Sequence, residues 1–91
     1  MEDIKNRYRK SLVKHIDALE SARADLLAGE PGAADAIWKI AHKLKGSGGT
    51  YGYQEITAAA EALQNSQEKE IPARQDALLA ILRKVAFEVI D

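Results

Sequence analysis

Cysteine is absent from this 91-residue sequence, and the chain holds only two prolines, one tryptophan and one phenylalanine. Without cysteine, a disulfide framework, a thiolate metal site and a cysteine nucleophile are all excluded, which suits a reducing compartment. The 13 basic and 14 acidic residues leave a formal net charge of −1. This balance provides no global field for nucleic acid, so a nucleic-acid-binding role is disfavoured.

Long apolar runs are missing as well. The longest fall far short of a membrane span, and residues 1–5 lack the apolar core of a signal peptide. We therefore expect a cytoplasmic protein with no membrane segment. The length predicts one domain over residues 1–91, sufficient for a compact core but not for a large substrate cavity. Met1 and this length favour a freestanding protein, although a domain excised from a longer chain has the same appearance.

Helix-forming residues dominate the chain, and strand-like alternation is absent. Apolar residues at steps of three and four predict helices over about 3–27, 31–48, 54–66 and from Pro72 onward. We expect a break in the first helix near Ser11 and a solvated connection over residues 67–70. Because the connections are short, the predicted fold is all-α, an antiparallel up-down-up-down four-helix bundle. One polar outer face per helix favours a monomer.

The predicted core consists of the apolar positions that recur on one side of each helix. These are Ile4, Tyr8, Leu12, Ile16, Leu19, Ala22 and Leu26 in the first helix, Ala33, Ile37, Ile40 and Leu44 in the second, Ile56, Ala59, Ala60 and Leu63 in the third, and Leu78, Leu79, Leu82, Val85, Ala86, Val89 and Ile90 in the fourth. The opposite sides of the helices are then left for solvent or for partners.

The second predicted helix turns His42 outward. At about 100° per residue, the apolar stripe between Ala33 and Leu44 lies at roughly 160–220° from the histidine. The residues within about 60° of His42 on the same wheel are Asp35, Trp38, Lys39, Lys45, Gly46 and Gly49. If the stripe faces the core, the imidazole is exposed to solvent.

Three glycines near the end of this helix need an explanation, because glycine costs about 1 kcal/mol against alanine inside a helix. Helical side chains lean over the preceding turn, so a side chain at position 46 would cover His42. Gly46 leaves the imidazole accessible, and Gly49 clears the next turn. Lys45 can place its ammonium beside the ring. Since neutral imidazole is a competent nucleophile at about pH 7, this pattern favours a histidine that accepts phosphate from another protein.

The run His42-Lys43-Leu44-Lys45-Gly46-Ser47, with Gly52 ten residues after the histidine, resembles the motif of the histidine-containing phosphotransfer (HPt) domain family. That motif is His-x-Leu/Ile-Lys-Gly-Ser/Ala, followed by small residues and a further glycine. The resemblance implies a phosphorelay intermediate of two-component signalling, a phosphoryl carrier without ATP-dependent kinase activity of its own. The doublet Gly48-Gly49 is a mild departure, which we expect to loosen the end of the second helix.

Carried over by position, the resemblance implies that His42 is phosphorylated through Nε2. Lys45 would stabilise the phosphoryl oxygens, and Gly46 would keep the site accessible. Gln64, 22 residues after His42, stands where a polar residue commonly hydrogen-bonds the active histidine of the family. An antiparallel third helix brings it back to the level of His42. The alternative for Gln64 is an ordinary surface glutamine.

The implied partners are response-regulator receiver domains, which donate and accept the phosphoryl group, and a hybrid sensor histidine kinase is a further partner left open. The receiver would bring Mg²⁺, and this chain is expected to bind no cofactor and no metal. The expected docking surface is the outer side of the second helix, with Trp38, Lys39, Lys43 and Gly49 around the histidine. Edge-of-core packing is the alternative for Trp38, although aromatic residues are enriched in interfaces.

Other functions fit less well. A kinase is disfavoured because residues 45–47 reverse the Gly-Lys-Ser order of a phosphate-binding loop. A metal or haem bundle needs several inward ligands, whereas the chain has two histidines and His42 faces outward. His15 lies beside the core stripe without a motif, and we assign it no function. The alternative that stays open is a four-helix interaction module that binds receiver-like or kinase partners without relaying phosphate.

Overall fold

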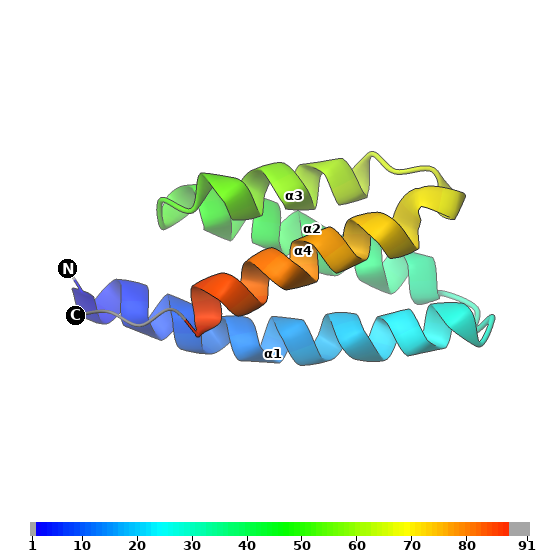
Figure 1. Ribbon diagram of the computed structural model, residues 1–91, viewed down its shortest axis with the longest axis horizontal. Coiled ribbons are helices and arrows are strands. Elements are labelled where there is room, and N and C mark those ends of the chain that lie inside the picture. The colour runs from blue at the N-terminus through cyan, green and yellow to red at the C-terminus, as the bar shows by residue number, and fades with distance from the viewer. Residues whose placement is uncertain (1, 88–91) are drawn as a thin grey trace.

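Four α-helices, each antiparallel to the one before it, form the bundle (Figure 1). The computed structural model describes residues 2–87. Its helices are α1 (Glu2–Leu27), α2 (Ala33–Thr50), α3 (Gln54–Gln64) and α4 (Ile71–Ala86), and the short 3-10 helix η1 (Glu68–Glu70) precedes α4. The bundle measures 42 × 20 × 17 Å, and α1 runs along most of its longest dimension. The predicted all-α, up-down-up-down architecture is confirmed.

The turn between α2 and α3 depends on Gly52. Its backbone is left-handed, with φ at +85°, a conformation that glycine adopts without the steric penalty of a Cβ. The following N–H, that of Tyr53, donates to the carbonyl of Gly48 at 2.7 Å and closes the last turn of α2. Gly29, with φ at +75°, ends α1 in the same manner. The second glycine of the sequence motif is therefore explained by the turn.

The core lies where the apolar stripes of the four helices meet, and it contains most of the predicted positions. The buried apolar residues are Tyr8, Leu12, Ile16, Leu19, Ala22, Ala33, Ile37, Ala41, Leu44, Ile56, Ala60, Leu63, Leu78, Leu79, Leu82 and Val85. Leu26, Ile40, Ala59 and Ala86 are partly buried against this cluster. Val89 and Ile90, also expected in the core, lie outside the described residues.

One predicted core position, Ile4, is wrong, and Ile40 lies at the edge of the core. Ile4 is 54% exposed, because it lies in the first turn of α1, at the end of the bundle. Ile40 is only partly buried, whereas Ala41 is fully buried. The buried face of α2 is thus rotated toward α3, because small residues on that side let the two helices approach closely.

The local predictions near Ser11 and in the last connection also need correction. α1 continues through Ser11 without a break, and the Ser11 hydroxyl donates to the Tyr8 carbonyl at 2.6 Å. In the connection, the Gln67 backbone N–H donates to Glu70 Oε1 at 2.9 Å and starts η1. The same hydrogen bond lowers the pKa of the Glu70 carboxyl. The connection is exposed, as expected, but it is an ordered helical turn.

A buried polar residue, Gln75, ties α4 to α1. Its Nε2 donates to the Leu19 carbonyl at 2.6 Å, and its side chain is fully buried. Nearby, the Arg23 guanidinium donates to the Pro72 carbonyl at 3.0 Å and pairs with the carboxylate of Asp76. These contacts hold the N-terminal end of α4 against the second half of α1.

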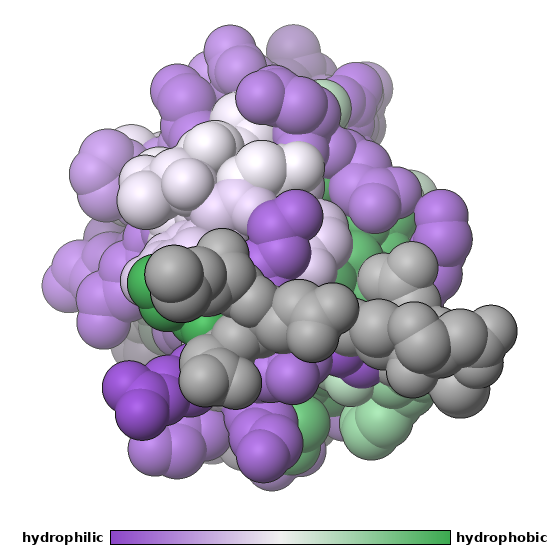
Figure 2. Space-filling view, turned by 90° about the vertical axis from the view of Figure 1, so that its left-hand side faces the viewer, coloured by the Kyte–Doolittle hydropathy of each residue, from purple (hydrophilic) through white to green (hydrophobic). Residues whose placement is uncertain are grey.

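The surface is mainly hydrophilic at the end of the bundle where α1 begins. Figure 2 shows this end with hydrophilic side chains around most of its rim, an area of intermediate hydropathy in its upper part and smaller hydrophobic areas. Among residues 2–87, no helix is long and apolar enough to cross a membrane.

The helices α2 and α3 pack closely at Gly48. A Cβ at this position would lie 2.9 Å from Thr57 Oγ1 and 3.1 Å from Ile56 Cβ. Thr57 Oγ1 is itself held by a hydrogen bond that it donates to the Lys45 carbonyl at 2.9 Å. The expectation that the glycine doublet loosens α2 is wrong, since the helix continues to Thr50 and packs tightly at this glycine.

Replacing Gly48 by alanine should therefore destabilise the fold, although alanine is the better helix former. We expect Gly48→Ala to cost about 1–2 kcal/mol in the free energy of unfolding, because the added methyl forces Thr57 and Ile56 apart from α2. The matched control is Gly46→Ala, whose Cβ meets no atom within 4 Å and should stabilise the helix by about 0.5–1 kcal/mol. Urea unfolding followed by circular dichroism measures both, and equal stability of the two variants would contradict the packing argument.

Candidate functional site

His42 lies on the exposed side of α2, on the edge that faces α3. The apolar residues Ile37 and Leu44, on the other side of the same helix, are buried. This is the outward orientation that the helical wheel predicts. The imidazole thus sits on a helix whose opposite face is packed in the core, so its backbone is held rigidly while its ring remains accessible.

Gln64, in the last turn of α3, contacts the imidazole. Its Nε2 lies 3.2 Å from Nδ1 of His42, within hydrogen-bonding distance. In this orientation the amide N–H donates to Nδ1. A 180° rotation of the amide instead presents Oε1, which accepts a hydrogen bond from a protonated Nδ1. The second orientation leaves the lone pair of the imidazole Nε2 free, which is the state that a nucleophile requires.

Trp38 lies one helical turn before His42 and stacks on it. The two rings are nearly parallel, with an interplanar angle of 6° and centroids 5.3 Å apart. The indole is exposed rather than packed at the edge of the core. The structure therefore joins Trp38, His42 and Gln64 into one side-chain cluster from α2 and α3.

Glycine keeps the space beyond His42 open. A Cβ at Gly46 would meet no atom within 4 Å, and one at Gly49 would only touch Thr57 Oγ1 at 3.5 Å. Lys45, between them and the histidine, is half-buried, and its carbonyl accepts the hydrogen bond from Thr57. Among the described residues, no ion pair or hydrogen bond engages the Lys45 ammonium, which leaves this charge available to an incoming anion.

Lys39 and Lys43, the two lysines of the expected docking surface, have other neighbours than Lys45. Lys39 pairs with Asp35 one turn earlier, at 3.0 Å, and both side chains are exposed. Lys43 is exposed on the side of α2 that faces α1, where its charge acts on His15. Burial first, and then this ammonium, lower the pKa of His15. Lys39 and Lys43 thus flank His42 without contacting its ring.

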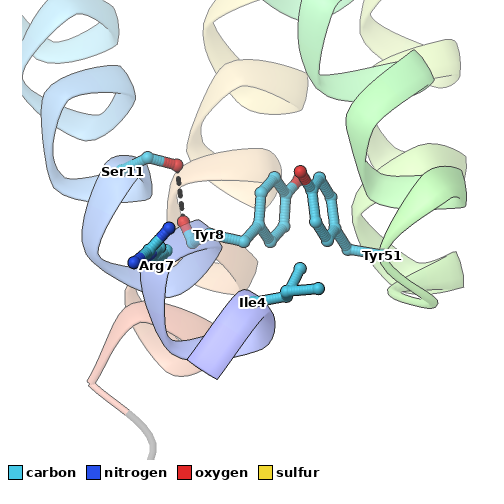
Figure 3. Close-up of a pocket in the computed structure, with 5 residues that line it drawn as sticks. All are labelled: Ile4, Arg7, Tyr8, Ser11 and Tyr51. Atoms are coloured by element: carbon cyan, nitrogen blue, oxygen red, sulfur yellow. Dashed lines mark hydrogen bonds between the residues drawn. The ribbon is translucent and has the colours of Figure 1, made fainter. Parts of the chain in front are cut away.

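On its other side, α2 is joined to α1 by an aromatic contact. The Tyr8 hydroxyl and the Ser47 hydroxyl are hydrogen-bonded at 2.9 Å, and the ring of Tyr8 stacks on that of Tyr51 with centroids 4.4 Å apart. Burial raises the pKa of Tyr8 above its usual range. Figure 3 shows both rings beside Ile4, where they border an open concavity of about 390 Å³ that Arg7 and Ser11 also line. Ser47 of the motif therefore serves packing on the α1 side.

Sequence reasoning missed two features of this region. One is the stacking of Trp38 on His42, which the i, i+4 spacing of the two residues could have indicated, because such pairs are neighbours on a helix. The other is Thr57, whose hydroxyl holds α3 against the backbone of α2. No local signal marks Thr57, since its partner lies 12 residues away and only the packing of two helices brings them together.

Within the part of the chain that the structure describes, no group of three or more histidine, aspartate or glutamate side chains is arranged to hold a metal ion.

The model of the Hpt domain family matches residues 3–86, which is almost the entire chain, and the chain therefore belongs to that family. Hpt domains are phosphocarrier modules of two-component signalling rather than kinases, so the chain has a phosphotransfer role in such signalling. Comparison with curated proteins and with solved structures finds no match.

The lowered pKa of His15 predicts a pH-dependent stability. Because the unfolded chain binds this proton more readily than the folded one, the free energy of unfolding should fall as the pH decreases below the ordinary pKa of 6.5. In His15→Gln, urea midpoints measured at about pH 7.5 and pH 5 should differ less than in the wild type. Lys43→Gln removes only the charge and should reduce the difference less. An unchanged pH dependence in His15→Gln would contradict this account.

Proposed function

We propose that His42 is the phosphoryl-accepting residue of a phosphorelay. It takes the group from the aspartyl phosphate of one receiver domain and passes it to another. The observation that carries the proposal is an exposed imidazole whose Nδ1 lies 3.2 Å from the Gln64 amide, while Gly46 leaves the ring uncovered. The chain supplies the nucleophile and a docking surface, and the receiver supplies the rest of the active site.

The transfer is a displacement at phosphorus. The lone pair of His42 Nε2 forms the N–P bond while the P–O bond to the aspartate breaks, and the carboxylate leaves with the electron pair. The proton stays on Nδ1, where Gln64 Oε1 accepts its hydrogen bond once the amide has rotated. Because phosphoryl transfer depends mainly on in-line positioning and charge stabilisation, a fixed and exposed imidazole is sufficient on this side.

Charge on the transferring group is stabilised from both partners. On this chain, the Lys45 ammonium, which has no partner among the described residues, lies on the same helix three residues after His42. Charge-assisted hydrogen bonds from such a group to phosphoryl oxygens are about twice as strong as neutral ones. In this proposal the Mg²⁺ comes with the receiver's aspartate site, and we expect the chain itself to bind no cofactor.

The docking surface is the outer side of α2 around His42. Trp38 provides an exposed aromatic side chain, and Lys39 and Lys43 provide positive charge. Gly49 has no side chain that would obstruct a partner at the last turns of α2. A receiver, or the receiver portion of a hybrid sensor kinase in the cytoplasm, fits this surface, because the carboxylate-rich site that binds its Mg²⁺ complements the lysines.

Labelling tests the proposal directly. The wild-type chain, mixed with Mg²⁺ and a receiver domain phosphorylated by radioactive acetyl phosphate, should acquire label that is labile in acid and stable in base, as expected for an N–P bond. His42→Gln should acquire none. His15→Gln is the matched control, because it removes the other histidine and should be labelled like the wild type.

Two results would overturn the assignment. Label that persists in His42→Gln places the phosphoryl group elsewhere. Binding of the receiver without any label on the wild-type chain would favour the non-relaying interaction module instead.

The accessibility of His42 can be tested separately at Gly46. Gly46→Gln adds a side chain that leans over the imidazole, so we expect the rate of transfer from the phosphorylated receiver to fall on the order of 10–100-fold. Gly46→Ala adds a methyl group that meets no atom within 4 Å, and its rate should stay close to that of the wild type. Rapid-quench measurements give both rates, and equal rates for the two variants would refute the role assigned to this glycine.

A further inference from the structure

Trp38 is stacked on His42, so it can affect phosphoryl transfer by positioning the imidazole. Its indole is 47% exposed, so it contributes little to the core, yet it lies nearly parallel to the imidazole, at 6°. The chain has no other tryptophan. Offset stacking of aromatic rings is favourable at centroid distances of about 4.5–7 Å, and the 5.3 Å observed here lies in that range.

The indole covers one face of the imidazole and leaves the route to Nε2 open. Helical side chains lean toward the preceding turn, so the ring of His42 lies over Trp38, and a side chain at Gly46 would lie over His42. At Gly46 there is open space. The lone pair of an imidazole nitrogen lies in the ring plane, so a group stacked on the face does not obstruct in-line attack at the edge.

Trp38 and Gln64 restrict different motions of the same ring. The hydrogen bond at Nδ1 acts on the edge of the imidazole, from α3. The stacking contact acts on its face, from α2. Together they define both the direction in which Nε2 points and the tilt of the ring plane, which reduces the orientational cost of in-line transfer.

Phosphorylation changes the charge of the stacked ring. With a proton on Nδ1 and phosphorus on Nε2, both nitrogens carry a substituent and the ring is formally cationic. The electron-rich face of an indole attracts a cation within about 6 Å of its centroid, and the present separation of 5.3 Å meets that condition. The stacking contact should therefore be stronger in the phosphorylated protein than in the free one.

We propose that Trp38 is a positioning residue for His42 that also stabilises the phosphorylated ring and so shifts phosphoryl exchange toward this chain. The inference rests on the proposed phosphorylation of His42. It concerns an equilibrium between separated proteins, which is independent of how tightly the receiver docks. A residue that served docking alone would change the rate of exchange and leave the equilibrium ratio unaltered.

The test measures that ratio for the wild type, Trp38→Leu and Trp38→Phe. Each chain is mixed with the phosphorylated receiver and Mg²⁺ of the labelling experiment, and the distribution of label is determined once it is constant. Leucine is apolar but has no aromatic face, so the ratio should shift about two- to fivefold toward the receiver. Phenylalanine keeps an aromatic face and should restore most of the wild-type ratio. Urea unfolding verifies that both variants fold.

A spectroscopic readout needs neither a receiver nor a variant of Trp38. Charging of the wild-type chain with phosphoramidate, a small-molecule phosphoryl donor, should change the emission of its single tryptophan, because a cation forms against the indole. His42→Gln should show no change. If Trp38→Leu fails to fold, this measurement still tests whether the indole interacts with the phosphorylated imidazole.

The outcomes distinguish a failure of the role proposed for Trp38 from a failure of the proposed phosphorylation of His42. An unchanged ratio in Trp38→Leu, or an unchanged emission, together with normal labelling of His42, would overturn the role of Trp38 and leave the proposed function intact. Absence of label on the wild-type chain from both donors would remove both proposals.

Discussion

The close approach of α2 and α3 at Gly48 is the contact on which the arrangement around His42 depends. A Cβ at this point would lie 2.9 Å from Thr57 Oγ1, so only glycine permits the separation that is observed. Thr57 uses that proximity to hydrogen-bond the Lys45 carbonyl. Gln64 follows Thr57 by seven residues, about two helical turns, and therefore lies on the same side of α3. Packing at a glycine thus determines where the amide meets the imidazole.

The six residues from His42 to Ser47 serve different neighbours because a helix distributes consecutive positions around its axis. His42 and Gly46 face outward, and Leu44 is buried in the core. The Lys45 carbonyl accepts a hydrogen bond from α3, and the Ser47 hydroxyl is hydrogen-bonded to Tyr8 of α1. The contiguous motif therefore combines a chemical site with the two contacts that hold its helix in place.

Most of the fold could be predicted from the sequence, because apolar spacing, glycine and proline act locally. The number of helices, their antiparallel order and the outward side of α2 follow from such signals, whereas the predicted ends of α2 and α3 are off by about two residues. The errors arise where tertiary contacts decide. Ala41 is fully buried while Ile40 is only partly buried, and Gly48 allows close packing where propensity alone indicated a loose helix end. The hydrogen-bonding partner of His42 on α3 was predictable from counting residues. The i, i+4 spacing makes Trp38 a neighbour of His42, but the near-parallel stacking of the two rings depends on their rotamers.

Because the turn after α2 is short, the number of residues between α2 and α3 matters as much for the site as the identity of its side chains. Its geometry is closed by the hydrogen bond from the Tyr53 N–H to the Gly48 carbonyl and by the left-handed Gly52. One inserted or deleted residue between Gly48 and Thr57 would disrupt this closed turn and change how α3 is placed against α2. Gln64 would then point away from His42 even though every side chain of the site was retained. Homologous sequences that keep the motif but differ in this spacing must orient their histidine with another residue.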